Sequence, residues 1–390
     1  MIKKRNYGSD TIIAHSGREP EEHFGFVNTP VYRGSTVLSK SSKEFRTKSS
    51  KYTYGSRSNP NTDGLSFSIQ KIENAYGCKI TSSGRTAILL SLLSVVENND
   101  HILISDNVYD PTKQIADKFL FKMGVKISYF NPKKIDELDS MIQNNTKAIF
   151  FESPGSVTFE IIEIDQLIDI CKKHNLYSII DNTWGTPLYF KPFDYEIDIS
   201  LHAGTKYIVG HADTFIGAVS FNQKVSKKVE DTFDLLRLSA SPDDAYQASK
   251  GLRTIKIRME KQFENTIKIC NFLYKHKNIE EILYPPFEHS RDHNLWKKYF
   301  KNGGASLMTI ILKNTKNNID VLDTFIDELK LFGIGASWGG YESLIMPVSP
   351  NRQTTDQWGQ FKNSMVRLHI GLEDPEDLID DLRHSLRKLS

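Results

Sequence analysis

The feature that most constrains the fold of this chain is an alternation between short β-branched runs and amphipathic segments, which begins near residue 65. The runs with the length and composition of strands are His101–Ser105, Val125–Phe130, Lys147–Glu152, Leu176–Asp181, Ile197–Leu201 and Thr214–Val219. The segments with helical spacing are Leu65–Tyr76, Gly84–Val96, Thr112–Lys122, Ile135–Gln143 and Asp165–His174. This alternation predicts an α/β fold, a mostly parallel sheet with helices on both faces. A pair of unrelated α+β domains is the alternative.

Two further parts flank this region. After Pro242, a long helical pattern over Asp243–His276 leads into a smaller α/β unit. Its candidate strands are Ile282–Tyr284, Leu307–Leu312 and Met365–Ile370, and its candidate helices are Val321–Leu331 and Pro375–Lys388. The first 60 residues lack a core of their own, so they must lie on another domain or subunit, or move freely. We therefore expect an N-terminal arm (1–60), a large domain (61–250) and a small C-terminal domain (251–390).

The composition excludes several functional classes. Fifty basic and 48 acidic residues give a net charge of +2, which does not favour nucleic-acid or membrane-surface binding. Three widely separated cysteines favour neither a disulfide framework nor a metal site, and they suit a reducing cytoplasm. No apolar run approaches the ~20 residues of a membrane span, and the first ten residues lack the apolar core of a signal peptide. We expect a cytoplasmic enzyme that needs no metal.

Reactive side chains follow three of the predicted strands. The loops are Phe150–Gly155, Ile180–Trp184 and His202–Tyr207, and the reactive groups on them are the Asp181 carboxylate, the Lys206 amine and a hydroxyl. Because the carboxyl ends of parallel strands meet at one edge of a sheet, where ligands bind, these groups are predicted to lie together.

This set of groups suits pyridoxal phosphate. A partly desolvated lysine can form a Schiff base with an aldehyde, and a buried carboxylate can hold a protonated pyridine nitrogen. The N–H groups of Thr81–Ala87, at the start of a predicted helix, can bind a phosphate. Each residue also has an ordinary explanation, because Lys206 can be a surface lysine, Asp181 a loop cap and Tyr109 a packed aromatic. The combination in this order favours the cofactor.

The order of these motifs resembles that of the pyridoxal-phosphate enzymes of cysteine and methionine metabolism, the trans-sulfuration family. The matching segments are Ile180–Trp184, Thr205–Asp213, Lys250–Thr254 and Arg367–Asp374, and the resemblance extends from about residue 10 to the end. It implies the fold of the pyridoxal-phosphate-dependent transferases (the aspartate aminotransferase type) and pyridoxal 5′-phosphate as cofactor. It also implies a small sulfur amino acid as substrate and a homotetramer built as a dimer of dimers.

Within that family, two segments resemble the cystathionine β-lyases. Glu152–Ser156 has Gly-Ser after the proline, where the family commonly has Asn, and Trp338 stands where γ-eliminating relatives usually have Leu. The resemblance implies β-elimination of L-cystathionine to homocysteine, pyruvate and ammonia in methionine biosynthesis, and activity on other cysteine S-conjugates. A γ-lyase, a cysteine desulfhydrase and a non-catalytic binding protein on the same fold stay open. A nicotinamide-dependent dehydrogenase is disfavoured, since no Gly-x-Gly-x-x-Gly follows an early strand.

The resemblance assigns the residues around the cofactor ring and the substrate. Lys206 would form the Schiff base and move protons, and Asp181 would pair with the pyridine nitrogen. Tyr109 would stack on the ring and is, with Lys206, a candidate catalytic residue. Arg367 would bind the substrate carboxylate through a bidentate fork. The residues assigned to the substrate are Tyr109, Ser337, Trp338 and Arg367.

The resemblance also assigns a phosphate site, which this chain alters at two positions. The assigned residues are Gly84, Arg85, Thr205, and, from a neighbouring subunit, Tyr54 and Arg57. Ser56 stands where the family usually has Arg, and Arg57 follows one position later. Ala203 stands where the family tends to have Ser, so one phosphate hydrogen bond, about 1–3 kcal/mol, is expected to be absent.

Overall fold

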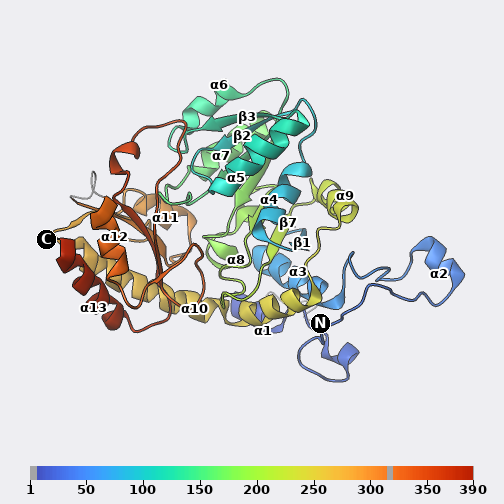
Figure 1. Cartoon of the computed structure of the whole chain (residues 1–390). Coiled ribbons are helices and arrows are strands. Elements are labelled where there is room, and N and C mark those ends of the chain that lie inside the picture. Colours follow the sequence, from blue (N-terminus) through green and yellow to red (C-terminus); the bar gives the residue numbers. More distant parts are fainter. Residues whose placement is uncertain (1–6, 314–318, 390) are drawn as a thin grey trace.

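The computed structural model describes residues 7–313 and 319–389 and contains two β-sheets joined by one long helix (Figure 1). The strands of the larger sheet are β1 (Gly77–Thr81), β2 (His101–Ser105), β3 (Lys126–Phe130), β4 (Thr146–Glu152), β5 (Tyr177–Asp181), β6 (Ile199–His202) and β7 (Gly217–Phe221). Their spatial order is β1-β7-β6-β5-β4-β2-β3. Only the two pairs that contain β7 are antiparallel. The prediction of a mostly parallel sheet is therefore confirmed.

The larger sheet is buried on both faces. Side chains alternate along each strand, so that Leu103 and Phe151 join one apolar cluster, whereas Ile104 and Phe150 join the other. The helices that pack on the first face are α3 (Pro60–Glu73), α7 (Ile164–Lys173) and the start of α10 (Pro242–Tyr274). Those on the second face include α4 (Gly84–Leu93), α5 (Asp110–Ile115) and α9 (Ser226–Leu236). The expected helices on both faces are present.

The smaller sheet forms the second layered unit. Its strands are β8 (Ile279–Leu283), β9 (Leu307–Leu312), β10 (Gly333–Ile334), β11 (Leu344–Pro347) and β12 (Met365–His369), in the order β10-β11-β12-β9-β8. The helices in this region include α11 (His293–Tyr299), α12 (Ile319–Asp327) and α13 (Pro375–Leu386). The 33-residue helix α10 (Pro242–Tyr274) runs beneath both sheets (Figure 1). In the part of the chain that the structure describes, no helix is long and apolar enough to span a bilayer.

The N-terminal region contains α1 (Ser9–His15), a 3-10 turn at Pro20–His23 and α2 (Ser42–Thr47). Helix α1 packs on α3 and α10, and its Ile13 is buried in the core, whereas α2 projects from the body of the molecule (Figure 1). Phe24 is 98% exposed and Leu38 is 88% exposed. A single chain thus leaves these apolar groups in water, which agrees with an arm that packs on a neighbouring subunit. That contact and the three domain boundaries stay predictions, and residues 1–6 of the arm lie outside the described part.

Several predicted elements were wrong in detail. Strand β1 was missed, because it is a short edge strand with a glycine and a lysine. The single helix expected over Thr112–Lys122 is α5 followed by a π-helical turn (Ala116–Leu120) and a 3-10 turn (Phe121–Met123). The helix expected over Ile135–Gln143 is a 3-10 turn followed by the four-residue α6 (Leu138–Met141). The strand expected at Thr214–Val219 begins at Gly217, because the backbone of Ile216 is already bonded to the loop residue Thr205. Strands β10 and β11 were also missed, being only two and four residues long.

Candidate active site

The carboxyl edge of the larger sheet brings the predicted reactive groups together. Glu152 and Asp181 are the last residues of β4 and β5 and are directly paired. Burial is the main cause that raises the pKa of the Tyr109 hydroxyl. The nearby charges of Glu152 and Asp181 raise it further, and those of Arg85 and Arg367 lower it. Residues from four separate segments therefore surround one point.

Lys206 lies in the turn after β6, where the smaller sheet covers it. Its Nζ donates a hydrogen bond to Ser337 Oγ at 2.8 Å and lies 5.6 Å from the centre of the Trp338 ring. Gly339, at φ +79°, packs so closely that a Cβ there would lie 2.8 Å from the Lys206 carbonyl carbon. Burial and then the charge of Arg367 lower the pKa of Lys206 to about 8. An amine with this pKa is partly neutral at neutral pH and can act as a nucleophile and as a base.

Asp181 is a buried carboxylate with one oxygen already hydrogen-bonded. The backbone N–H and the hydroxyl of Thr183 donate to Asp181 Oδ1 at 3.0 and 2.5 Å. Burial raises the pKa of the Asp181 carboxyl, while Thr183 and the charge of His202 oppose that shift. Among the described residues no group donates to Asp181 Oδ2, so this oxygen remains for a ligand cation.

The sequence presents Glu152 only as part of a loop motif, whereas the structure gives it a contact within the site. Its Oε2 accepts a hydrogen bond from the Tyr109 backbone N–H at 2.6 Å. Burial, and then the charge of Asp181, raise its pKa well above that of an ordinary glutamate. Glu152 therefore fixes the turn that carries the Tyr109 ring, which is 44% exposed. Its place at a strand end was the signal that could have identified it.

The start of α4 forms an anion site. The Ser83 hydroxyl caps the helix by accepting from the Thr86 N–H at 3.2 Å. The N–H groups of Gly84 and Arg85 have no protein acceptor among the described residues. A Cβ at position 84 would lie 2.6 Å from the Ala203 Cβ, so only glycine fits there. The two free N–H groups suit a phosphate.

The other predicted phosphate ligands are placed less directly. The Thr205 hydroxyl donates to the Ile216 carbonyl at 3.2 Å and accepts from its N–H at 2.9 Å. Arg57 forms an ion pair with Asp234 of α9 at 3.0 Å. Tyr54 lies in the arm, where its backbone pairs with Thr36, and it is 50% exposed. The roles assigned to these residues stay predictions.

Arg367 reaches the site from β12 of the smaller sheet. One of its terminal nitrogens donates to the carbonyl groups of Ala336 and Ser337 at 2.7 and 3.2 Å. Burial lowers its pKa to about 10, so it is still cationic at neutral pH. An anion beside Lys206 and Arg367 would relieve the repulsion between two buried cations. This geometry suits a substrate carboxylate.

A segment that sequence reasoning missed holds the two sheets together. We call residues 351–357 the strap. Asp106, the first residue after β2 in the loop that carries Tyr109, accepts hydrogen bonds from two N–H groups and one hydroxyl of the strap at 2.7–2.8 Å. It also pairs with buried Lys113 at 2.8 Å, and Arg352 of the strap pairs with Glu160. The strap therefore clamps the smaller sheet region onto the loops at the site.

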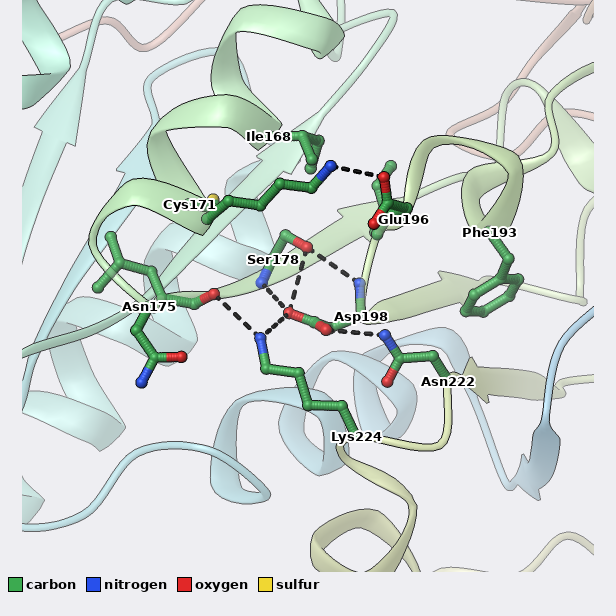
Figure 2. Close-up of a pocket in the computed structure, with 12 residues that line it drawn as sticks. Ile168, Cys171, Asn175, Ser178, Phe193, Glu196, Asp198, Asn222 and Lys224 are labelled. Atoms are coloured by element: carbon green, nitrogen blue, oxygen red, sulfur yellow. Dashed lines mark hydrogen bonds and ion pairs between the residues drawn. The ribbon is translucent and has the colours of Figure 1, made fainter.

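A cavity of about 480 Å³ lies at the opposite edge of the larger sheet, near the start of β5 and β6. Figure 2 shows that its polar side chains contact one another, as in the bonds of Asp198 with Ser178, Asn222 and Lys224. Lys172 likewise pairs with Glu196 at 2.5 Å. Because these groups satisfy one another, the cavity offers no reactive centre.

The residues at the carboxyl edge fit pyridoxal phosphate. Lys206 offers an amine of lowered pKa for the aldehyde, Asp181 Oδ2 an acceptor for the ring nitrogen, and the start of α4 free N–H groups for the phosphate. The described residues contain no group of three or more His, Cys, Asp or Glu side chains placed to hold a metal.

Comparisons with known proteins agree with this fit. The model of the family described as "Cys/Met metabolism PLP-dependent enzyme" matches residues 10–387. A putative cystathionine beta-lyase of Rhizobium johnstonii is 35% identical over 99% of this chain and 98% of its own length. An L-alanine/L-glutamate racemase of Wolbachia pipientis is 34% identical over 97% of each chain.

A solved structure agrees as well. A putative O-acetylhomoserine (thiol)-lyase of Campylobacter jejuni, which contains a pyridoxyl-lysine monophosphate, superposes with a TM-score of 0.89. The two chains are 25% identical, and the match covers 98% of this chain and all of the other. The expected aspartate aminotransferase-type fold of this chain is therefore confirmed. The cofactor is pyridoxal phosphate. This chain belongs to the Cys/Met metabolism family of pyridoxal-phosphate-dependent enzymes.

Proposed function

We propose that this protein is a carbon–sulfur lyase that converts L-cystathionine and water to homocysteine, pyruvate and ammonia. The observation that carries the proposal is the desolvated Lys206 amine, of pKa about 8, between Arg367 and the Trp338 ring. When bound, pyridoxal phosphate supplies an electron sink for the charge that develops at the substrate Cα. The remaining work is done by side chains of this chain.

Arg367 and the loop at Ser337 orient the substrate. The free guanidinium nitrogens of Arg367 bind the α-carboxylate, and the negative charge of that carboxylate offsets the repulsion between Arg367 and Lys206. Trp338 forms an apolar wall beside the amine, which excludes water from the carbon that loses its proton. The substrate is thereby held with its Cα–H bond toward Lys206.

Lys206 then moves the protons. Its neutral amine removes the Cα proton, and the pair of electrons left behind expels the sulfur from Cβ as a thiolate. Homocysteine leaves after the thiolate takes a proton, for which the Lys206 ammonium is the nearest donor. Water hydrolyses the remaining three-carbon fragment to pyruvate and ammonia, so that all atoms of cystathionine and one water are accounted for.

Two features favour β-elimination over the γ-lyase and desulfhydrase alternatives. The Rhizobium relative is named a putative cystathionine beta-lyase, and the match runs along the full length of both chains. Trp338, which γ-eliminating relatives usually replace by Leu, lies directly beside Lys206. A cysteine desulfhydrase would release sulfide rather than a larger thiol.

Amino-acid racemisation is the second candidate, because the Wolbachia racemase matches nearly as well. Racemisation shares the first step, removal of the Cα proton by Lys206, and differs in that the proton returns to the opposite face. It therefore needs a second acid across the ring. We propose the Tyr109 hydroxyl, whose pKa is raised by burial, as that acid.

The active unit is proposed to be a homotetramer in the cytoplasm. Exposed apolar groups on the arm, such as Phe24 and Leu38, support burial against a second copy. Tyr54 and Arg57 would then reach the phosphate of that copy.

A substrate panel on purified, cofactor-saturated protein tests the proposal. Cystathionine should give pyruvate and homocysteine, whereas a γ-lyase gives 2-oxobutanoate and cysteine, and a racemase gives D-amino acids from L-alanine or L-glutamate without keto acid. Lys206→Ala should abolish pyruvate formation and the visible absorbance of the cofactor, and Lys227→Ala, at an exposed lysine, should change neither. Pyruvate formation by Lys206→Ala would contradict the assignment.

A further inference from the structure

A second pair of buried ionisable groups, Glu73 and His202, lies beside Asp181 and has no part in the steps above. Glu73 ends α3 and His202 ends β6, and the two are 0% and 1% exposed. His202 Nε2 donates to Glu73 Oε1 at 2.8 Å, and Ser200 donates to the same oxygen at 2.8 Å. Apolar residues of equal volume stabilise a core as well as such a pair does. The pair therefore calls for another explanation.

The backbone places this pair next to Asp181. Strands β5 and β6 are paired with Asp181 opposite Leu201, so His202 is the next residue along the neighbouring strand. Asn182 follows Asp181 directly, and its side-chain amide donates to Glu73 Oε1 at 3.3 Å. Glu73 is thus hydrogen-bonded to β6 and to Asn182, the residue that directly follows β5.

A second hydrogen-bonded path leads from His202 to Asp181. The N–H of Ala203, which follows His202, donates to Thr183 Oγ1 at 2.9 Å. That hydroxyl in turn donates to Asp181 Oδ1 at 2.5 Å. The position of the His202 backbone therefore sets the bond that fixes the Asp181 carboxylate.

The charges agree with this connection. Burial raises the pKa of the Glu73 carboxyl, but His202, together with hydrogen bonds from Ser220 and Ser200, outweighs burial and the net shift is downward. His202 also opposes the upward shift that burial causes in the pKa of Asp181. Lys191 is the other cation near Glu73, but its amine donates to two backbone carbonyl groups. The Cys78 thiol also faces Glu73 and has a raised pKa. His202 is thus the partner that both carboxylates share.

We propose that Glu73 and His202 form a positioning pair that keeps Asp181 ionised and oriented, so that Asp181 holds the protonated pyridine nitrogen of the cofactor. The inference rests on the proposed role of Asp181. Neither residue of the pair is among the groups that fit the cofactor, which are Lys206, Asp181 and the start of α4. Their loss therefore weakens the cofactor contact through Asp181 alone, while Lys206 and the phosphate site are left in place.

The variants Glu73→Gln and His202→Asn test the pair, with Asp198→Asn as a matched control. Asp198 is also a buried carboxylate of the same sheet, 4% exposed and hydrogen-bonded to Ser178, Asn222 and Lys224 (Figure 2). It lies at the opposite edge, just before the start of β6. The dissociation constant of pyridoxal phosphate and the visible absorbance of the bound cofactor are measured without substrate. A rise of one unit in the pKa of Asp181 corresponds to a tenfold change in the equilibrium between its ionised and neutral forms. We expect the constant to rise about tenfold and the absorbance to shift in both test variants, and neither to change in Asp198→Asn.

Unchanged constants and spectra in both folded test variants would overturn the inference, as would an equal change in the control. If Glu73→Gln does not fold, Ser200→Ala removes only one hydrogen bond to Glu73 and decides the question. A rise of the dissociation constant in Ser200→Ala supports the pair, and an unchanged constant overturns it. Borohydride reduction of the unaltered protein followed by peptide mapping separates the two proposals. A label away from Lys206 overturns the proposed function itself, whereas a label on Lys206 with unchanged variants overturns only the pair.

Discussion

The lowered pKa of Lys206 makes a quantitative prediction for the protein without cofactor. A lysine of pKa about 8 is neutral in about a tenth of molecules at pH 7, whereas an ordinary lysine of pKa 10.5 is neutral in about one in 3000. Lys206 should therefore react with an aldehyde about 300-fold faster at pH 7 than an ordinary lysine of equal intrinsic reactivity. Its rate should rise with pH and level off above about 8.

The assay is the rate at which full-length protein stripped of cofactor takes up pyridoxal phosphate, followed by visible absorbance between pH 6 and 11. Lys206→Ala reports the background from surface lysines. Arg367→Gln removes the positive charge that disfavours the Lys206 ammonium, so the midpoint should move upward. It should stay below 10.5, because burial is the larger cause and remains. Arg367→Lys keeps the charge and should leave the midpoint near 8.

Two results would refute this reasoning. A rate that keeps rising to pH 10 in the unaltered protein would mean that Lys206 is not desolvated before the cofactor binds. A midpoint that is unmoved or lower in Arg367→Gln would mean that Arg367 does not act on the Lys206 charge. Because the readout is a midpoint and not a rate, slower binding in a variant does not mimic either result.

Three further outcomes are expected. Asp106→Ala leaves Lys113, whose side chain is 4% exposed, without its counter-ion. The free energy of unfolding, measured by urea titration, should therefore fall by about 3–5 kcal/mol. Asp231→Ala, which breaks an exposed pair, should lower it by less than about 1 kcal/mol. Burial raises the pKa of the Asp106 carboxyl, but its hydrogen bonds with Lys113 and Thr354 outweigh burial and the net shift is downward. The contribution of Asp106 to the free energy of unfolding is therefore complete above pH 3.8 and is lost as the pH falls through the lower folded value. Acid unfolding of Asp106→Ala, compared with that of the unaltered protein, measures this loss. Gly84→Val should weaken pyridoxal-phosphate binding at least tenfold in equilibrium dialysis, because its side chain meets Ala203, while Gly359→Val, in open space, should not.

The residues at the strand ends could be predicted from the sequence, because strand periodicity is local. Asp181 ends β5 and Lys206 follows β6, as expected from the runs that precede them. The strap could not be predicted, since Asp106 and the N–H of Gln353 are 247 positions apart and nothing near either residue indicates the other. The Glu73–His202 contact spans 129 positions and was missed for the same reason.

The direction of β7 shows a second limit. Its five residues are all buried and read as a strand, but both of its neighbours run antiparallel to it. An apolar run of this kind gives no indication of direction, which depends on the connection that precedes it. Here the loop from Lys206 returns along the same edge, and Ile216 pairs with Thr205 before the strand begins. The reversal therefore follows from contacts of the lysine loop itself.

The chemistry of Lys206 depends on contact between the two sheets, and this connects the strap to the reaction. Trp338 lies beside the Lys206 amine, Gly339 packs on the Lys206 backbone, and the charge of Arg367 repels the Lys206 ammonium. All three belong to the smaller sheet region. The strap hydrogen-bonds that region to Asp106 on the larger sheet. If the strap is released, water reaches the amine and its pKa returns toward 10.5, although no residue that touches the cofactor has changed. The sequence supplies the lysine, and the closure of the two sheets makes it reactive.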